Sequence, residues 1–294
     1  MLQSVVLPGQ FGTLLGVTID GLAFGLFLSL LGVGITLVFG LGEVLNLAIG
    51  SFAVIAGLAA SLLTTTADLN PVLASVLAIV GVAILGLVVD RTILSLVYRS
   101  EGEERILLGI FTTLGLTIFL EGLFEHFYPG TYSLQLRFSV IDLGFTVLTV
   151  SSLLQIVASV VALAILFLFL RRTFLGRATR TVFQDEVGAL LVGVDPRRMR
   201  SLVFVLSSLI AAIAGVLFVV GAPVRVVDGF QLTIFALIVS IVGGVRNVEG
   251  AVVAGIFLGL VIQYANFFIG AFVANVILFT VAVVAILFKP AVLS

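Results

Sequence analysis

Residues that could carry catalytic or metal chemistry are scarce in this sequence. The chain of 294 residues has no Cys and one His, His126, which leaves no thiolate chemistry and no histidine cluster for a metal ion. Its one Lys, Lys289, precedes Pro290, so there is no phosphate-binding loop of the Gly-x-x-x-x-Gly-Lys-Ser/Thr type. We therefore expect no catalytic residue, metal or cofactor, and any ATP that drives the protein must bind to another subunit.

The composition is that of a membrane protein. Hydrophobic residues make up 61% of the chain and charged residues only 10%, whereas a soluble domain is about 25% charged. A soluble fold of this size could not bury so much apolar surface, so lipid must cover the excess. The formal net charge of -1 gives no reason to expect a nucleic-acid partner.

The apolar runs predict the elements that position any functional residue. They are continuous rather than alternating, which indicates spanning helices and excludes β-barrel strands. We expect an all-α, polytopic transmembrane helix bundle of about eight or nine segments, forming one domain over residues 1–294. The stretch 232–250 fits either a re-entrant segment or a helix continuous with its neighbour. The expected spans are Leu22–Phe39 (beginning as early as Phe11), Val44–Leu63, Pro71–Val89, Ile106–Leu123, Val150–Leu170, Leu202–Ala222, Leu232–Val245, Ala251–Phe268 and Phe272–Phe288.

Basic residues orient these spans. Three Arg fall between residues 91 and 105, and seven fall between residues 171 and 200. Successive loops between spans lie on opposite sides of the membrane. This places 12 of the 14 basic residues on one side, and Arg137 and Arg225 on the other. By the positive-inside rule the richer side is cytoplasmic. We expect a multi-pass protein with its C-terminus in the cytoplasm and its N-terminus outside.

The longest polar connection, residues 171–200, contains a helical pattern. Gly193 suits a C-terminal cap with positive φ, and Asp195 followed by Pro196 suits the start of the next helix. The pattern predicts one short amphipathic helix lying parallel to the bilayer. Its apolar residues recur at three- and four-residue spacing, which places them on one side of that helix: Val182, Phe183, Val187, Leu190 and Leu191.

Two interpretations fit this helix. Its Arg residues could contact anionic lipid headgroups, or the helix could dock into a groove on a cytoplasmic partner. Asp185 and Glu186 slightly favour docking, because acidic residues contribute nothing to binding anionic lipid.

Glycine-rich interruptions break the apolar sequence in both halves. Residues 40–51 read GLGEVLNLAIGS, and residues 243–250 read GGVRNVEG. Non-helical backbone at membrane depth is tolerated only where protein buries it or water reaches it. Glycine-broken segments in both halves are typical of a transport path. Tight cytoplasmic turns are the alternative explanation, especially for the second stretch.

Charge inside the predicted spans is nearly absent. Asp20 and Glu121 lie near the outer ends of the first and fourth spans. Ion-driven carriers usually place a series of acidic or basic residues deep in the bundle. The absence of such a series argues against a secondary transporter.

Four blocks of the sequence resemble the branched-chain amino acid ABC-transporter permease family (LivH type), and the resemblance extends over nearly the whole chain. The sequence departs from the family pattern at three places: Ile49 stands where His is common, Glu249 replaces a frequent Pro, and the end reads Lys289-Pro290-Ala291-Val292. The first departure leaves the substrate open. The four blocks are residues 34–57 (GITLVFGLGEVLNLAIGSFAVIAG), 112–123 (TTLGLTIFLEGL), 171–195 (RRTFLGRATRTVFQDEVGALLVGVD) and 240–261 (SIVGGVRNVEGAVVAGIFLGLV).

The resemblance implies a permease subunit of an ATP-driven importer in the cell membrane of a prokaryote, moving branched-chain or related amino acids. The implied partners are two cytoplasmic ABC ATPase subunits, a second related permease or a second copy of this chain, and an extracytoplasmic substrate-binding protein. The same machine with another small solute, such as a sugar, nucleoside or amide, is the nearest alternative. A secondary carrier and a membrane scaffold are further ones.

The resemblance also suggests residues for two tasks. Those expected along the substrate path are Asn46, Gly50 and Ser51. Those expected to couple the permease to the ATPases, with the two glycines setting the turns around the helix, are Gly176, Arg177, Arg180, Asp185, Glu186 and Gly193.

Overall fold

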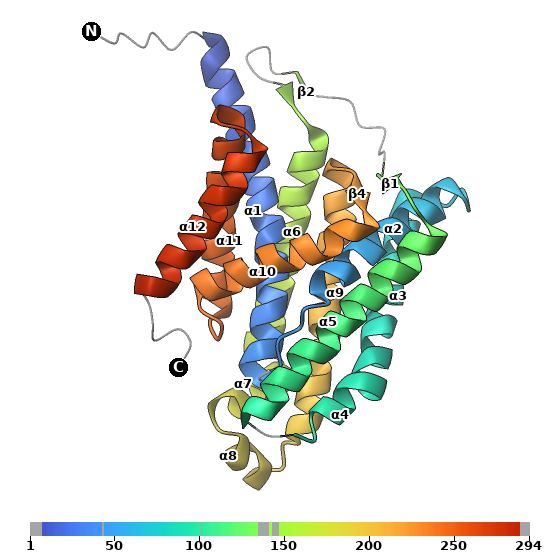
Figure 1. Cartoon of the computed structure of the whole chain (residues 1–294), viewed down its shortest axis with the longest axis vertical. Coiled ribbons are helices and arrows are strands. Elements are labelled where there is room, and N and C mark those ends of the chain that lie inside the picture. The colour runs from blue at the N-terminus through green and yellow to red at the C-terminus, as the bar shows by residue number, and fades with distance from the viewer. Residues whose placement is uncertain (1–7, 43, 101, 135–140, 143–146, 289–294) are drawn as a thin grey trace.

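The computed structural model describes residues 8–42, 44–100, 102–134, 141–142 and 147–288, and these form a helical bundle (Figure 1). Among the described residues, seven helices are long and apolar enough to cross a membrane, and two shorter apolar helices accompany them. The prediction of an all-α bundle with eight or nine apolar segments is therefore confirmed.

The N-terminal half contains α1 (Pro8–Gly42), α2 (Ile49–Thr65), α3 (Pro71–Val89), the π-helical turn η1 (Asp90–Leu94), α4 (Ser95–Val97) and α5 (Gly102–Phe127). The C-terminal half contains α6 (Val150–Arg172), α7 (Phe174–Gln184), α8 (Glu186–Leu191), α9 (Pro196–Gly221), the 3-10 turn η2 (Val226–Asp228), α10 (Gly229–Gly243), α11 (Val248–Phe268) and α12 (Ala271–Phe288). Two short antiparallel pairs join β1 (Thr131–Tyr132) to β4 (Val224–Arg225) and β2 (Ile141–Asp142) to β3 (Val147–Leu148).

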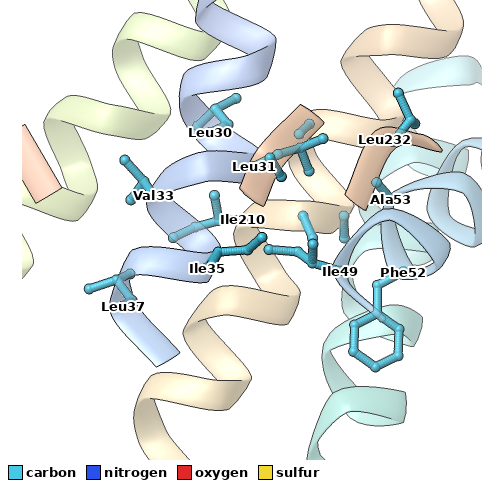
Figure 2. Close-up of a cluster of buried hydrophobic side chains, with 14 of the residues drawn as sticks. Leu30, Leu31, Val33, Ile35, Leu37, Ile49, Phe52, Ala53, Ile210 and Leu232 are labelled. Atoms are coloured by element: carbon cyan, nitrogen blue, oxygen red, sulfur yellow. The ribbon is translucent and has the colours of Figure 1, made fainter. Parts of the chain in front are cut away.

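The helix α1 lies at the centre of the bundle and is buried along most of its length. Figure 2 shows its apolar side chains interleaved with those of neighbouring helices, including Ile210 and Leu232. On another face, a Cβ added to Gly259 would lie 2.2 Å from the Cα of Gly25. The backbones of α1 and α11 therefore touch, because small residues let two membrane helices approach closely.

The peripheral helices α3, α5 and α6 are apolar but mostly exposed within the single chain. Their exposed positions include Val72 on α3, Phe111 on α5 and Ile165 on α6, with exposed fractions of 73%, 69% and 63%. So much apolar surface requires lipid or a partner membrane protein to cover it.

The basic residues gather at one end of the bundle. The turns η1 and α4, the helices α7 and α8, the end of α6 and the starts of α5 and α9 all lie there (Figure 1). These elements and the turn after α4 hold the Arg residues of 91–105 and 171–200. Arg225 belongs to the β1–β4 pair near the opposite end. Arg137 and Lys289 lie outside the described residues. The grouping agrees with the predicted alternation of loops.

Candidate functional site

The second apolar segment is not helical throughout. Helix α2 begins at Ile49, not at Val44 as expected, and residues 44–48 form an irregular connection from α1. Val44, Asn46 and Ala48 in this connection have exposed fractions of 0%. The interruption is thus, over residues 44–48, non-helical backbone buried by protein, one of the two situations that make such backbone tolerable.

Three threonines from two other helices form hydrogen bonds with backbone groups of this non-helical connection. Thr113 of α5 accepts a hydrogen bond from Leu47 N at 3.1 Å. The hydroxyls of Thr117 and Thr233 lie 2.9 and 3.0 Å from the carbonyl oxygen of Leu47. We did not identify these threonines from the sequence. The four-residue spacing of Thr113 and Thr117 was the available signal, because it places both hydroxyls on one face of α5.

The start of α2 contacts the start of α10 directly. Gly50 N donates to Thr233 Oγ1 at 3.0 Å, and a Cβ on Gly50 would lie only 2.0 Å from the carbonyl oxygen of Gly229. Glu121 Oε1 accepts a hydrogen bond from Phe230 N, in the first turn of α10, at 2.7 Å. The N-termini of α2 and α10 and the carboxylate of Glu121 therefore meet inside the bundle. The helix dipole stabilises a negative charge near a helix N-terminus.

All three residues expected along the path lie in this region. Asn46 Oδ1 accepts from Ala48 N at 3.0 Å, while Asn46 Nδ2 is buried without a partner among the described residues. Ser51 is buried beside Glu121, and the space between them is too small for water. Ile49, at the position where the family commonly has His, is fully buried and packs against Gly34 of α1. The structure thus brings these residues together in a closed arrangement.

The connection between α6 and α9 differs from the single amphipathic helix that the sequence predicts. It contains two helices, α7 and α8, separated at Asp185, whose backbone is extended with φ -155° and ψ 106°. Asp favours helix caps over helix interiors because its short side chain competes for backbone hydrogen bonds. The prediction of one helix with one continuous apolar face was wrong for this reason.

The two helices bury different amounts of their apolar surface. In α7, Ala178 and Val182 pack against the bundle with exposed fractions of 6% and 5%. In α8 only Ala189 is buried, and the larger apolar side chains are exposed, with fractions of 68% for Val187, 57% for Leu190 and 84% for Leu191. The side chain of Phe183 lies outside the described part. Helix α8 therefore presents an apolar surface that this chain does not cover.

Of the predicted turn and cap residues, Gly193 and Asp195 occupy their expected places and Gly176 does not. Gly193 has φ +79°, and Val194 N and Gly193 N bond to the carbonyl oxygens of Ala189 and Leu190, which is a Schellman cap. Asp195 caps α9 by accepting from Arg197 N at 2.9 Å. Gly176, expected to set a turn by its position outside the helix, lies instead in the first turn of α7. A Cβ there would lie 2.3 Å from the carbonyl oxygen of Phe169.

The charged coupling candidates fall into two groups. Arg177, Arg180 and Asp185 are exposed. Glu186 instead forms an ion pair with Arg200, with 2.6 Å between Oε2 and Nη2, and the Arg200 side chain is only 4% exposed. Arg200 Cζ also lies 5.9 Å from the ring centroid of Tyr98, within the range of a cation–π contact.

A buried polar cluster surrounds Arg200 and was not identified from the sequence. Ser201 donates a short hydrogen bond to Asp90, the first residue of the π-helical turn η1. Burial, and then the nearby negative charge of Asp90, raise the pKa of the Tyr98 hydroxyl, which therefore stays protonated. The carboxylates do not complete a metal site, since the described part of the chain has no group of three or more His, Cys, Asp or Glu able to hold an ion. The cluster joins α8, α9 and η1.

The second glycine-rich interruption forms a tight turn between α10 and α11. Gly244 has φ +101°, and Asn247 caps α11 by accepting from Gly250 N at 3.0 Å. Glu249 forms an ion pair with Arg171 at the end of α6. For this stretch the turn interpretation is correct. Leu232–Val245 belongs mostly to α10, which starts at Gly229 beside α2 and ends at this turn.

These features define an α-helical, multi-pass membrane protein with a broken helix inside its bundle and an exposed apolar helix at its basic end. The family described as branched-chain amino acid transport system / permease component matches residues 17–288. The chain belongs to this family and is a membrane permease.

Three comparisons place the chain among known proteins. It is 25% identical over 297 residues to the high-affinity branched-chain amino acid transport system permease protein LivH of Salmonella typhimurium, covering 96% of this chain and 95% of that protein. It is 29% identical to a probable branched-chain amino acid transport permease protein LivH of Methanocaldococcus jannaschii, covering 79% of this chain and 75% of that protein. Its fold is similar to that of PsaBC from Streptococcus pneumoniae in complex with Fab, with a TM-score of 0.50, 14% identity, and coverage of 93% and 90%.

Proposed function

We propose that this chain is one of the membrane subunits of an ATP-driven importer for branched-chain or related amino acids. The relatives that match along the chain are named as permeases of branched-chain amino acid transport systems, which supports this cargo. The single observation that carries the proposal is the exposed apolar surface of α8, because an importer of this kind needs a place for an ATPase to attach.

The ATPase would contact the segment 171–200. Val187, Leu190 and Leu191 would enter an apolar groove on the ATPase. Arg177, Arg180 and Asp185, which are exposed, would form the polar rim. Gly193 would keep the turn after α8, and Gly176 would let the start of α7 pack closely against the end of α6. Glu186 would hold α8 to α9 through Arg200 rather than contact the ATPase.

The substrate would move past residues 44–48, the non-helical connection between α1 and α2, which is called the broken segment below. Asn46, Gly50 and Ser51 would line the path once α10 moves away from α2, since they are closed off when the two helix starts are in contact. ATP binding and the loaded binding protein must favour different arrangements of these helices, because a ligand that binds two states equally shifts neither.

The basic end of the bundle would lie in the cytoplasm, following the positive-inside rule. The N-terminus and the β1–β4 pair would then lie outside, where an extracytoplasmic binding protein would deliver the substrate. A second permease, either a related subunit or another copy of this chain, would cover part of the exposed apolar surface of the peripheral helices.

Reconstitution tests the proposal. The permease pair, its ATPases and its binding protein would be placed in liposomes with ATP inside or outside, and uptake of labelled leucine, isoleucine and valine measured. We expect uptake that requires ATP on the ATPase side and persists with ionophores. Uptake abolished by ionophores but independent of ATP would overturn the proposal in favour of a secondary carrier. Uptake of only a sugar or nucleoside would support an ATP-driven importer but contradict amino acids as its substrate.

A further inference from the structure

A cavity lined by both polar and apolar side chains lies toward the end of the bundle opposite to α7 and α8. Its volume is about 440 Å³. The helices α1, α6, α9, α10, α11 and α12 contribute to its lining, mostly through their ends away from the basic side. It is distinct from the closed space around Ser51 and has no role in the contacts described above.

The lining of this cavity is unusual for helices that are otherwise apolar. One carboxylate, Asp20, faces it, and Asp20 Oδ1 accepts a hydrogen bond from Ser152 Oγ at 2.7 Å. No Arg or Lys is among the described residues of the lining. Side-chain amides supply both donors and acceptors around it: Gln155, Gln231, Gln263, Asn266 and Asn275.

The same cavity has an aromatic wall. Phe27 of α1 and Phe218 of α9 stack with 4.6 Å between ring centroids, and Phe24 and Phe235 also contribute. A branched aliphatic side chain would leave water on packing against this aromatic wall, which is favourable by the hydrophobic effect. One cavity thus combines a negative group, amide donors and an apolar surface.

The helix α10 separates this cavity from the broken segment. Gln231 and Phe235 of α10 face the cavity, while Thr233, on another side of the same helix, bonds to Gly50 N in α2. A solute in the cavity would therefore lie against the helix whose displacement would open the broken segment.

We propose that this cavity is the loading site for the importer, and that it recognises the zwitterionic head of an α-amino acid with an apolar side chain. The inference rests on the proposed function and deepens it. The Asp20 carboxylate binds the ammonium group, the amide N–H groups of the lining donate to the carboxylate, and the phenyl rings receive the side chain. A carboxylic acid that lacks the ammonium group is disfavoured, because its charge meets Asp20 with no cation nearby.

Equilibrium binding tests the site without the binding protein, which would otherwise set the apparent affinity. The permease–ATPase complex in nanodiscs would be titrated with leucine, 4-methylpentanoate, which lacks the ammonium group, and 3-methylbutylamine, which lacks the carboxylate. We expect leucine to bind at least ten times more tightly than either analogue. Asp20→Asn should weaken leucine binding about ten- to a hundredfold, as for loss of a charge-assisted hydrogen bond, and remove the preference over 4-methylpentanoate.

Asp68→Asn is the matched control. Asp68 is exposed in the connection between α2 and α3, and its positive φ of 52° is one that Asn tolerates. It should leave all three affinities unchanged. If Asp20→Asn yields no folded complex, Gln231→Glu replaces it, because Gln231 is exposed at the cavity; the added carboxylate should weaken leucine binding and strengthen binding of the amine.

The outcomes separate this inference from the proposed function. ATP-driven leucine uptake by the wild-type complex, together with leucine binding that Asp20→Asn changes less than twofold, would overturn the cavity assignment alone. Absence of leucine binding by the wild-type complex would overturn it as well. If uptake of every amino acid tested were also absent, the proposed function would fail together with it.

Discussion

Glu186 on the exposed helix α8 is paired with Arg200, a buried residue in the first turns of α9, with 2.6 Å between their charged atoms. Arg200 in turn lies over Tyr98, and the adjacent Ser201 bonds to Asp90 in η1. A displacement of α8 by a docked ATPase would therefore pull on α9 and on the turn after α3. The ion pair thus attaches α8 to the spanning helix α9.

The first prediction concerns this ion pair. Glu186→Ala leaves the Arg200 charge buried without its partner, and we expect it to lower the free energy of unfolding by about 2 kcal/mol. Adding Arg200→Met removes the unpaired charge and should restore most of that loss. Thermal unfolding of the purified permease measures both changes.

Glu249→Ala is the control, because its partner Arg171 is exposed with a side-chain fraction of 61%. Exposed pairs contribute little, about 0–1 kcal/mol. If Glu186→Ala were no more destabilising than Glu249→Ala, the Glu186–Arg200 pair would not be the attachment described here.

The sequence could predict those features of residues 171–200 that depend on local chemistry. Asp195 with Pro196 starts α9, and Gly193 adopts positive φ, because a cap or a positive φ is decided by one or two residues. Burial of Arg200 could not be predicted in the same way. It stands among seven Arg between residues 171 and 200, and only the packing of α3, α8 and α9 distinguishes it from the exposed ones.

The second prediction concerns Thr233. Thr233→Val keeps the shape of the side chain but removes the hydroxyl that accepts from Gly50 N, leaving a buried N–H unpaired. We expect a loss of about 1–3 kcal/mol in the free energy of unfolding, the usual cost of such a group. Thr280→Val on α12 removes an exposed hydroxyl bonded only within its own helix, and should change little. Equal melting temperatures for the two variants would contradict the role of Thr233.

The third prediction concerns the contact between α2 and α10. Gly50→Ala places a Cβ about 2.0 Å from the carbonyl oxygen of Gly229, so the two helix starts must separate. We expect a destabilisation of about 1–3 kcal/mol, as for overpacking of a core. The measurement is thermal unfolding, combined with crosslinking between cysteines introduced in α2 and α10.

Gly81→Ala provides the comparison. Nothing lies within 4 Å of a Cβ at Gly81 on α3, and Ala is more stable than Gly inside a helix by about 0.5–1 kcal/mol. Gly81→Ala should therefore be neutral or slightly stabilising. A Gly50→Ala protein that melts like Gly81→Ala would show that the close approach of α2 and α10 is absent in the protein.

The broken segment illustrates what a sequence leaves undetermined inside a membrane bundle. The interruption at residues 40–51 indicates that regular structure stops, since Gly and polar residues break the apolar run. The partners that make it stable are Thr113, Thr117 and Thr233, each far away in the chain. Threonines in apolar helices usually bond within their own turn, so only tertiary packing reveals which ones also reach another segment.

The last prediction concerns docking of the ATPase on α8. Leu191 is the most exposed of the apolar side chains of α8, at 84%, and an apolar groove that covered it would remove this surface from water, which favours binding. Leu191→Asp should reduce co-purification of the ATPases at least tenfold, since a buried carboxylate without a partner is costly. Leu191→Met keeps the apolar contact and should leave co-purification unchanged. Because Leu191 contributes nothing to the core of this chain, membrane insertion and melting temperature should be the same for both variants. Retention of the ATPases by Leu191→Asp would mean that α8 lies against lipid headgroups, and binding to vesicles containing anionic lipid would then fall for the same variant.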